Sequence, residues 1–336
     1  MKVLPVSKIE EALNILSKDA EVYAPIWRGQ MSGYYKWIDD ADDQLVMEAV
    51  NTYLSPKNIV IPQTEKMYSF NAPGNEATVT EVADQSAERI LFGVKPCDIK
   101  AIDALDMVFL TKGFVDDFYK IKRDKTTIIS RVCYQPGAAC FCESMGVDRM
   151  NPNADVFIHD IGNQNYAWEA KTPKGEAVTA KIAGLFEEKD AAMPKFLEMK
   201  RTVNVEGLAE KLKASFEHEA WESLSSRCMT CGVCSNVCPS CYCFDIQVRV
   251  WGDEGYRFRC WDSCMYREYS QMAGGHNPRD AKKERFRNRF LHKLEFFNER
   301  YGTALCTGCG RCVAMCPNMV NIVEVIKAFE GVQVDV

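Results

Sequence analysis

CMTCGVCSNVCP at residues 228–239 and CTGCGRCVAMCP at residues 306–317 are two copies of one pattern, in which four cysteines are spaced C-x2-C-x2-C-x3-C and proline follows the last. This is the bacterial ferredoxin run, in which three close thiolates bind one cubane and the fourth cysteine ligates the neighbouring cluster. The short gaps hold the sulfurs around a cubane, and Gly232 and Gly310 leave room for the backbone to approach it. The pair of motifs therefore predicts a domain built around two [4Fe–4S] clusters.

The crossed ligation rule divides these eight cysteines into two sets. One cluster is expected on Cys228, Cys231, Cys234 and Cys316, and the other on Cys306, Cys309, Cys312 and Cys238. Neither cluster then has an open ligand position, and the two must lie close together, as electron relay requires. A single C-x2-C pair would equally suit a zinc site, but two matching tetrads, each closed by Cys-Pro, favour iron–sulfur clusters.

The linker between the motifs has 67 residues, 239–305, and much of it has helical periodicity. Apolar residues also recur at helical spacing in residues 205–224 and 321–331, so we expect the chain from Glu187 onward to be mainly helical. A helical dicluster domain is therefore favoured over the small, β-rich ferredoxin fold.

The first half of the chain predicts a different architecture. A helix is expected near the N-terminus, where Ser7 and Glu10 form a capping box, and another at residues 99–109. Extended segments are expected at residues 21–26, 58–62, 89–94, 126–132 and 154–162, and short strands are expected at residues 165–180 on either side of a Pro-Lys-Gly turn. The fold class is therefore α+β, with an N-terminal α/β domain over residues 1–185 and a mainly α-helical, ferredoxin-type dicluster domain over residues 186–336.

Four further cysteines lie in the N-terminal half: Cys97, Cys133, Cys140 and Cys142. Two of them follow expected strands, which places them at the carboxyl edge of a sheet, where α/β folds usually carry their sites. Four thiols are the number that a cubane needs, so the sequence predicts a third [4Fe–4S] cluster here. Buried free cysteines are the alternative, because thiols are common in protein cores.

The last four cysteines form a formal tetrad in the linker: Cys241, Cys243, Cys260 and Cys264. They could help to bury the cofactors, bind a metal or carry a fourth centre, and the sequence favours a structural role. Seven basic residues lie between Arg279 and Lys293. They could form a solvated helix face, a docking site for an acidic partner, or a set of positive charges that compensates the negative charge of the clusters. His292 in the same segment could donate a hydrogen bond to a cluster sulfide.

Composition excludes several classes of function. The chain has 336 residues with 41 Lys and Arg against 47 Asp and Glu, so its net charge of −6 disfavours nucleic acid as a partner. No uncharged apolar run approaches the roughly 18 residues that span a bilayer, and no signal peptide is evident, so we expect a cytoplasmic protein without a membrane span. In that reducing compartment, sixteen cysteines are expected to bind metal and not to form disulfides.

The order of the motifs resembles one family along nearly the whole chain. The elements that carry the resemblance are GVKPCDI at 93–99, CFCESMG at 140–146, RCMTCGVCSNVCPSCYCFD at 227–245, WDSC at 261–264, RFLHKLEFFNERYG at 289–302 and the second cluster motif. They resemble a family of iron–sulfur subunits found in anaerobic sulfite reductase, in archaeal sulfhydrogenases, where it is the β subunit, and in flavin oxidoreductases coupled to heterodisulfide reductase. In that family the positions of the four N-terminal cysteines and of Cys241, Cys243 and Cys264 are matched, whereas Cys260 is this sequence's own addition.

The resemblance implies a subunit that is not catalytic alone. It would relay electrons between an FAD- and NAD(P)-binding diaphorase subunit and a catalytic subunit of a hydrogenase, sulfite reductase or heterodisulfide-reductase type, in a hetero-oligomeric oxidoreductase of anaerobic metabolism. No catalytic residue is expected in this chain, which lacks the common nucleotide-binding and hydrolytic motifs. Two alternatives remain open: a flavin-bearing iron–sulfur subunit resembling coenzyme-F420 hydrogenase β, and a zinc-stabilised scaffold.

Overall fold

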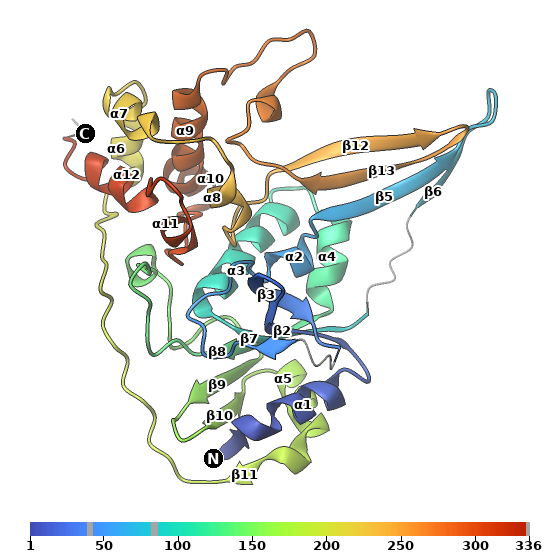
Figure 1. Cartoon of the computed structure of the whole chain (residues 1–336), viewed down its shortest axis with the longest axis vertical. Coiled ribbons are helices and arrows are strands. Elements are labelled where there is room, and N and C mark those ends of the chain that lie inside the picture. Colours follow the sequence, from blue (N-terminus) through green and yellow to red (C-terminus); the bar gives the residue numbers. More distant parts are fainter. Residues whose placement is uncertain (39–42, 82–86, 334–336) are drawn as a thin grey trace.

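The computed structural model of the chain describes residues 1–38, 43–81 and 87–333. In this part, a nine-stranded sheet has the order β11-β1-β10-β9-β8-β7-β2-β3, with β4 paired to β2 (Figure 1). The strands are β1 (Lys2–Pro5), β2 (Glu21–Arg28), β3 (Met31–Lys36), β4 (Gln44–Leu45), β7 (Arg89–Val94), β8 (Thr126–Arg131), β9 (Val156–Asp160), β10 (Asn165–Ala170) and β11 (Glu187–Glu188). The central pairs β2/β7, β7/β8 and β8/β9 are parallel, and the outer pairs are antiparallel.

Helices cover both faces of this sheet, as its apolar central strands require. The helices of this half are η1 (Val6–Lys8), α1 (Ile9–Leu16), α2 (Lys57–Val60), α3 (Pro96–Leu110), α4 (Asp117–Asp124), η2 (Glu143–Met145), α5 (Pro173–Lys181) and η3 (Ala183–Leu185). Ile90 and Phe92 of β7 pack with α1 and α5, whereas Leu91 packs with α3 on the other face. The expected strands at 89–94 and 126–132 and the helix at 99–109 are therefore confirmed.

Three local predictions for the first half were wrong. The N-terminal helix has Lys8 as its N-cap, without a side-chain cap, because a 3-10 turn precedes it where a Ser7–Glu10 box was expected. Residues 57–60 form the short helix α2 and not an extended segment. The Pro-Lys-Gly segment begins helix α5: the side chain of Thr172 caps the amide of Gly175, and proline is favoured in the first helical turn.

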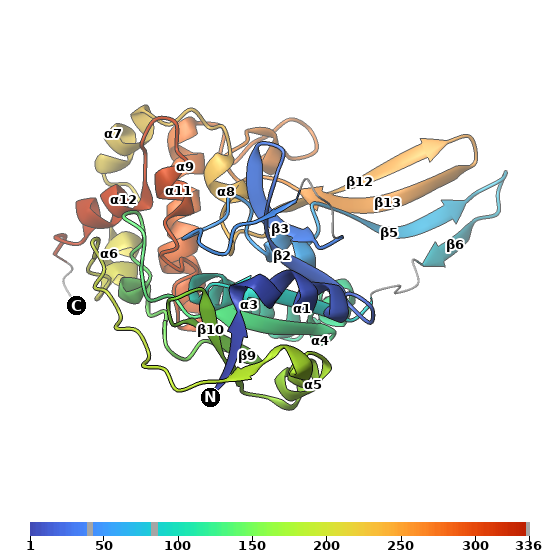
Figure 2. The same ribbon diagram turned by 60° about the horizontal axis from the view of Figure 1, so that its bottom comes forward.

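A second, four-stranded sheet projects from the body of the molecule (Figures 1 and 2). Its strands are β5 (Thr64–Asn71), β6 (Thr78–Glu81), β12 (Phe244–Trp251) and β13 (Glu254–Trp261), in the order β12-β13-β5-β6. Strands β12 and β13 form a hairpin closed at Gly252, which has a φ of +60°, and they come from the linker between the cluster motifs. The expectation of a helical chain from Glu187 onward is therefore wrong for residues 244–261, where apolar and polar residues alternate with a period of two. It is also wrong for residues 189–205, which contain neither helix nor strand.

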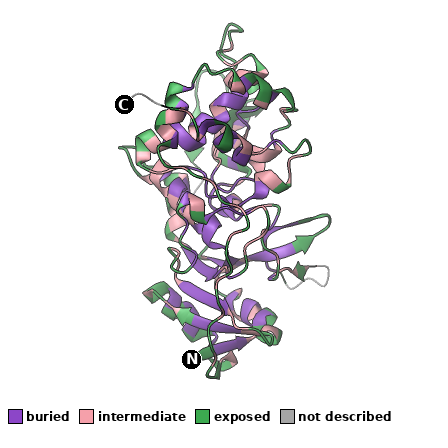
Figure 3. Ribbon diagram, turned by 90° about the vertical axis from the view of Figure 1, so that its left-hand side faces the viewer, coloured by how far each residue is buried: buried purple, intermediate pink, exposed green. Residues whose placement is uncertain are grey.

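The rest of the second half is helical. Its helices are α6 (Leu208–Ala214), α7 (Ala220–Ser226), α8 (Val233–Asn236), η4 (Glu268–Ser270), α9 (Lys282–Leu291), the π-helical turn η5 (His292–Phe296), α10 (Phe297–Tyr301), α11 (Arg311–Ala314) and α12 (Ile322–Phe329). Buried side chains of α6, α7, α9 and α12 form one core, and buried residues continue from there through the middle of the molecule to the large sheet (Figure 3). The α+β fold class is confirmed, and the domain boundary at residue 185 stays a prediction.

Candidate iron–sulfur centres

Four cysteines from both ends of the C-terminal half gather around one pocket, which we name site A. They are Cys228, Cys231, Cys234 and Cys316. The loop that forms the wall of this pocket has positive φ angles at Thr230 and Gly232. Backbone amides point at the sulfurs: Thr230 N lies 3.4 Å from Cys228 Sγ, and Val320 N lies 3.2 Å from Cys316 Sγ.

A second group of cysteines, site B, lies directly beside the first. It consists of Cys306, Cys309, Cys312 and Cys238, which face one another. Gly308 N lies 3.5 Å from Cys306 Sγ, and Cys312 also borders the pocket of site A. The last cysteine of each motif thus lies with the first three of the other motif, which is the arrangement that crossed ligation requires.

The N-terminal cysteines form a third group, site C, at the carboxyl edge of the large sheet. Cys97 lies in the first turn of α3 after β7, and Cys133 follows β8. Cys140 and Cys142 return to the same place, where Cys142 faces both Cys133 and Cys97. Burial raises the pKa of the Cys142 thiol to about 12, so metal binding here must displace its proton.

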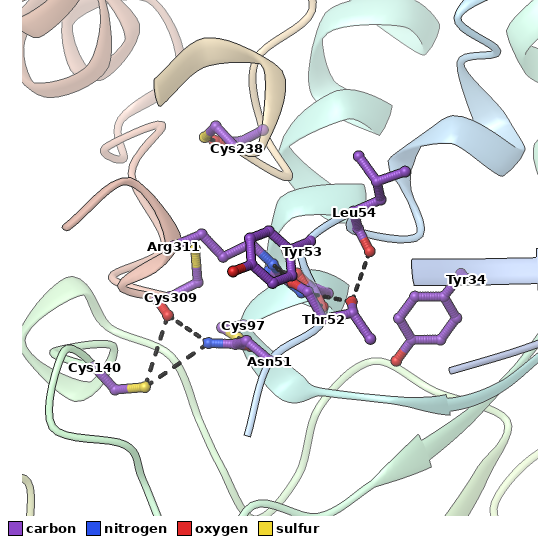
Figure 4. A network of polar contacts seen from close by, with 12 residues as sticks. Tyr34, Asn51, Thr52, Tyr53, Leu54, Cys97, Cys140, Cys238, Cys309 and Arg311 are labelled. Atoms are coloured by element: carbon purple, nitrogen blue, oxygen red, sulfur yellow. Dashed lines mark hydrogen bonds and ion pairs between the residues drawn. The ribbon is translucent and has the colours of Figure 1, made fainter. Parts of the chain in front are cut away.

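Sites B and C are joined through direct contacts (Figure 4). Asn51 Nδ2 donates a 2.6 Å hydrogen bond to the carbonyl oxygen of Cys309 and lies 3.9 Å from Cys140 Sγ. The amide of Phe141 donates to the Gly308 carbonyl at 2.9 Å. A Cβ added at Gly308 would lie 2.6 Å from the Cα of Cys142, so only glycine permits this approach.

A buried ion pair holds the same junction. Arg311, 1% exposed, directly precedes Cys312 and binds Asp98, 0% exposed, through both guanidinium Nη atoms, with Nη2 at 2.8 Å from Oδ2. Its Nε donates to the carbonyl of Thr52 at 2.7 Å. The second cluster motif is therefore fixed to the first half of the chain at the first turn of α3, which carries Cys97.

The basic segment before the second motif is not a solvated helix face. Arg285, Arg287, Arg289 and Lys293 are all buried. Arg289 borders the pocket of site A and faces Cys234, Cys238 and Cys312, and its Nε and Nη1 have no hydrogen-bond partner within the described residues. Lys293 Nζ lies 3.2 Å from Cys238 Sγ, and although burial disfavours its charge, the adjacent Cys238 and Cys241 raise the pKa of Lys293.

These cations support a fit between the cysteine sites and iron–sulfur clusters. A buried guanidinium with unpaired N–H groups needs an anion or acceptor nearby, and the sulfides and thiolates of a cluster supply both. Lys293 lies in the π-helical turn η5, a feature that often occurs at functional sites. The hydrogen-bond partner of His292 Nε2 is the Tyr242 hydroxyl, at 3.1 Å. In residues 1–38, 43–81 and 87–333, no group of three or more Cys, His, Asp or Glu side chains is placed closely enough to hold a metal ion.

The cysteines of the linker separate into two groups. Cys241, Cys243 and Cys264 lie next to one another and beside Cys238. Cys260 lies apart on β13, opposite Asp245. The formal tetrad of the sequence is therefore not one group in the structure.

Comparisons with known proteins agree with this description. A family model described as a 4Fe-4S dicluster domain matches residues 227–320. The chain is 31% identical over 331 residues to the sulfhydrogenase 2 β subunit of Pyrococcus furiosus, and the match covers 94% of each chain. The chain belongs to the sulfhydrogenase β-subunit family. The suspected family is thereby confirmed, and with it an iron–sulfur, electron-transfer subunit of an oxidoreductase.

Two further findings complete the comparison of this sulfhydrogenase β-family member. No solved structure matches the chain significantly. None of the helices in the described residues is both long and apolar enough to cross a bilayer.

Sequence reasoning missed several residues of the sites. Asn51, which contacts both site C and the Cys309 carbonyl, comes from a segment without a recognisable motif. Lys57 lies on α2, far from any cysteine in sequence, and its ammonium nevertheless donates to the Cys241 carbonyl at 2.8 Å. Only the long-range packing of the chain brings these residues to the cysteines.

Proposed function

We propose that this chain relays electrons through three [4Fe–4S] clusters, held at sites A, B and C, between two other subunits of an oxidoreductase. When bound, such clusters supply one-electron redox chemistry. The ligands would be the twelve cysteines of the three sites. The chain's own residues would hold the clusters in sequence, exclude water from the middle one and compensate their charge.

The observation that carries the proposal is the continuous row formed by sites A, B and C. Cys312 of site B borders the pocket of site A, and the Cys309 carbonyl of site B accepts hydrogen bonds at the edge of site C. A row of neighbouring centres is the arrangement that a relay needs.

The two ends of the row reach the surface, whereas its middle is enclosed. At site A, Cys231 is exposed, and the adjacent Met229 and Met319 are 61% and 73% exposed. At site C, Cys133 is partly exposed and borders a separate pocket together with Lys95 and Arg131. At sites B and C alike, three of the four cysteines are buried, but the partly exposed Cys312 of site B borders the pocket of site A, whereas Cys133 of site C borders a pocket of its own. This pattern supports electron entry at one end and exit at the other.

We propose that the partners are an FAD- and NAD(P)-binding diaphorase subunit and a catalytic redox subunit, and that the catalytic reaction takes place outside this chain. The relative from Pyrococcus furiosus is named as a sulfhydrogenase subunit, which supports a hetero-oligomer. A reducing, cytoplasmic location is supported by the sixteen cysteines, all of which are free.

The test is a cysteine-by-cysteine analysis of the complex purified anaerobically from its native host. Cys140→Ser is expected to remove about four irons and four sulfides per chain and one EPR signal of the reduced protein. It should also slow NAD(P)H-driven reduction of the catalytic subunit, and Cys260→Ser is the matched control. Unchanged iron and EPR in Cys140→Ser would contradict the three-cluster relay, bound flavin on this chain would favour the flavin-bearing alternative, and zinc without sulfide would favour the scaffold.

A further inference from the structure

Strand β12 forms one edge of the four-stranded sheet that projects from the body of the molecule (Figure 2). In the part of the chain that the structure describes, β12 pairs with β13 alone, and the pairing contains no bulge. Seven of its eight residues are exposed, and its sequence, FDIQVRVW, contains neither proline nor lysine. Bulges, prolines and lysines are the usual protection of a free edge against pairing with another strand. The outer edge of β12 is therefore open to the addition of a strand.

One hydrogen bond shows which backbone groups of β12 face outward. The carbonyl of Cys243, directly before the strand, accepts from the amide of Asp262 at 3.0 Å, so Cys243 points toward β13. This direction alternates along an antiparallel strand, and the register of β12 with β13 is regular. Four residues therefore turn their N–H and C=O groups to the free edge: Phe244, Ile246, Val248 and Val250. In agreement, the Ile246 amide donates to the Asp245 side chain at 2.8 Å.

The side chains of β12 divide into an apolar and a polar face, because they alternate with a period of two. Three aliphatic side chains share one face and are 39%, 52% and 61% exposed: Ile246, Val248 and Val250. The opposite face carries the exposed residues Asp245, Gln247 and Arg249. An acidic and a basic residue thus lie at equal distances on the two sides of Gln247.

This order of residues makes β12 complementary to itself. When two β12 strands pair antiparallel about a two-fold axis at Gln247, Asp245 of each copy lies opposite Arg249 of the other, and two ion pairs form on one face. On the other face, Ile246 lies opposite Val248 in both directions. These two residues turn their backbone groups outward, so the same register also forms the hydrogen bonds of the ladder. An axis displaced by one residue to either side would separate the opposite charges.

We propose that two copies of this chain associate through β12, which pairs antiparallel with β12 of the second copy about Gln247. The pairing joins the two projecting sheets into one continuous sheet. The Ile246 amide exchanges the Asp245 carboxylate for a carbonyl of the second copy, and the carboxylate becomes free to pair with Arg249 of that copy. The paired segments overlap by about 20 Å, so the two bodies lie at opposite ends of the joined strands. This association goes beyond the electron relay and does not depend on the number of clusters.

The experiment measures the mass of the whole, anaerobically purified chain by sedimentation equilibrium over a range of concentrations. We expect the wild type to reach twice the chain mass of 38.1 kDa. Asp245→Arg places like charges opposite one another twice and should raise the Kd of the dimer about tenfold or more. The double variant Asp245→Arg/Arg249→Asp restores both ion pairs and should recover the dimer. Asp253→Arg makes the same change of charge in the exposed hairpin turn, and this control should leave the dimer unchanged.

Val248→Pro tests the backbone of the edge. Proline removes an outward amide and leaves the ladder to β13 intact, so we expect a monomer with the iron content and circular dichroism of the wild type. A monomeric wild type, or a dimer that survives both Asp245→Arg and Val248→Pro, would overturn the proposal. It would also be overturned if the wild type is monomeric and Val248→Pro abolishes binding to another subunit, because β12 would then pair with a different protein. The iron content reports on the relay separately, so the two proposals can fail independently.

Discussion

Replacement of Arg311 by methionine tests the junction between sites B and C. The Arg311–Asp98 pair is almost completely inaccessible to solvent, and Arg311 also binds Thr52. Arg311→Met would leave the Asp98 carboxylate buried without its partner, and breaking a buried pair in this way costs about 3–5 kcal/mol. The effect should therefore be large although no cysteine is changed.

The size of the expected melting shift follows from the length of the chain. An unfolding entropy of about 2.1 cal/mol/K per residue gives about 0.7 kcal/mol/K for 336 residues that unfold together. A loss of 3–5 kcal/mol then lowers Tm by about 4–7 °C. Arg300→Met, at an exposed position of α10, is the control and should lower Tm by less than about 1 °C.

The assay is anaerobic differential scanning calorimetry at a fixed scan rate, since cofactor-containing proteins often unfold irreversibly. The double variant Arg311→Met/Asp98→Asn removes both charges and should recover most of the lost Tm. A shift of less than about 1 °C in Arg311→Met, or no recovery in the double variant, would refute a structural role of the pair at this junction.

Three other predictions address the same sites and the fold. Lys293→Met removes the ammonium beside Cys238 and should move the midpoint potential of the site B cluster to a more negative value. An EPR-monitored redox titration measures this potential, and an unchanged value would show that the ammonium does not affect the cluster. Gly308→Ala places a Cβ against the backbone of Cys142 and should lower the free energy of unfolding by about 2–5 kcal/mol. The control Gly302→Ala, where positive φ is the only obstacle, should lower it by about 1–2 kcal/mol. Equal losses for the two variants in denaturant unfolding would contradict the packing argument. Burial lowers the pKa of His159 below 6.5, so the unfolded state binds the proton at a higher pH than the folded state does, and the stability of the protein should fall as pH decreases from about 6.5. His159→Gln should flatten this part of the curve of stability against pH. A curve identical to that of the wild type would contradict this role of His159.

Local patterns predicted several elements, such as β7, β8 and α3, but not the contacts between distant segments. The cysteine spacing indicated sites A and B because their geometry follows from short loops. The β12–β13 hairpin escaped prediction because helical periodicity was read across a segment that alternates with period two, such as Val248 and Val250 on one side of β12. The hairpin is completed by β5, from the first half of the chain, as the pairing of Arg259 with Glu65 shows.

The surroundings of the cysteines were beyond sequence reasoning for the same reason. The seven basic residues before the second motif could equally have lain on a solvated face, and only tertiary packing buries Arg289 and Lys293 among thiols. Likewise, Cys260 and Cys264 are four residues apart, yet only Cys264 faces Cys243, because Cys260 lies on the strand and Cys264 lies beyond its end.

The most direct measurement of the central claim is an anomalous difference map at the iron absorption edge from crystals grown anaerobically. The account predicts separate iron peaks at sites A, B and C, arranged in one row. Peaks at sites A and B with none at site C would contradict the three-cluster relay. A signal at the zinc edge in place of iron at these sites would contradict the iron–sulfur account as a whole.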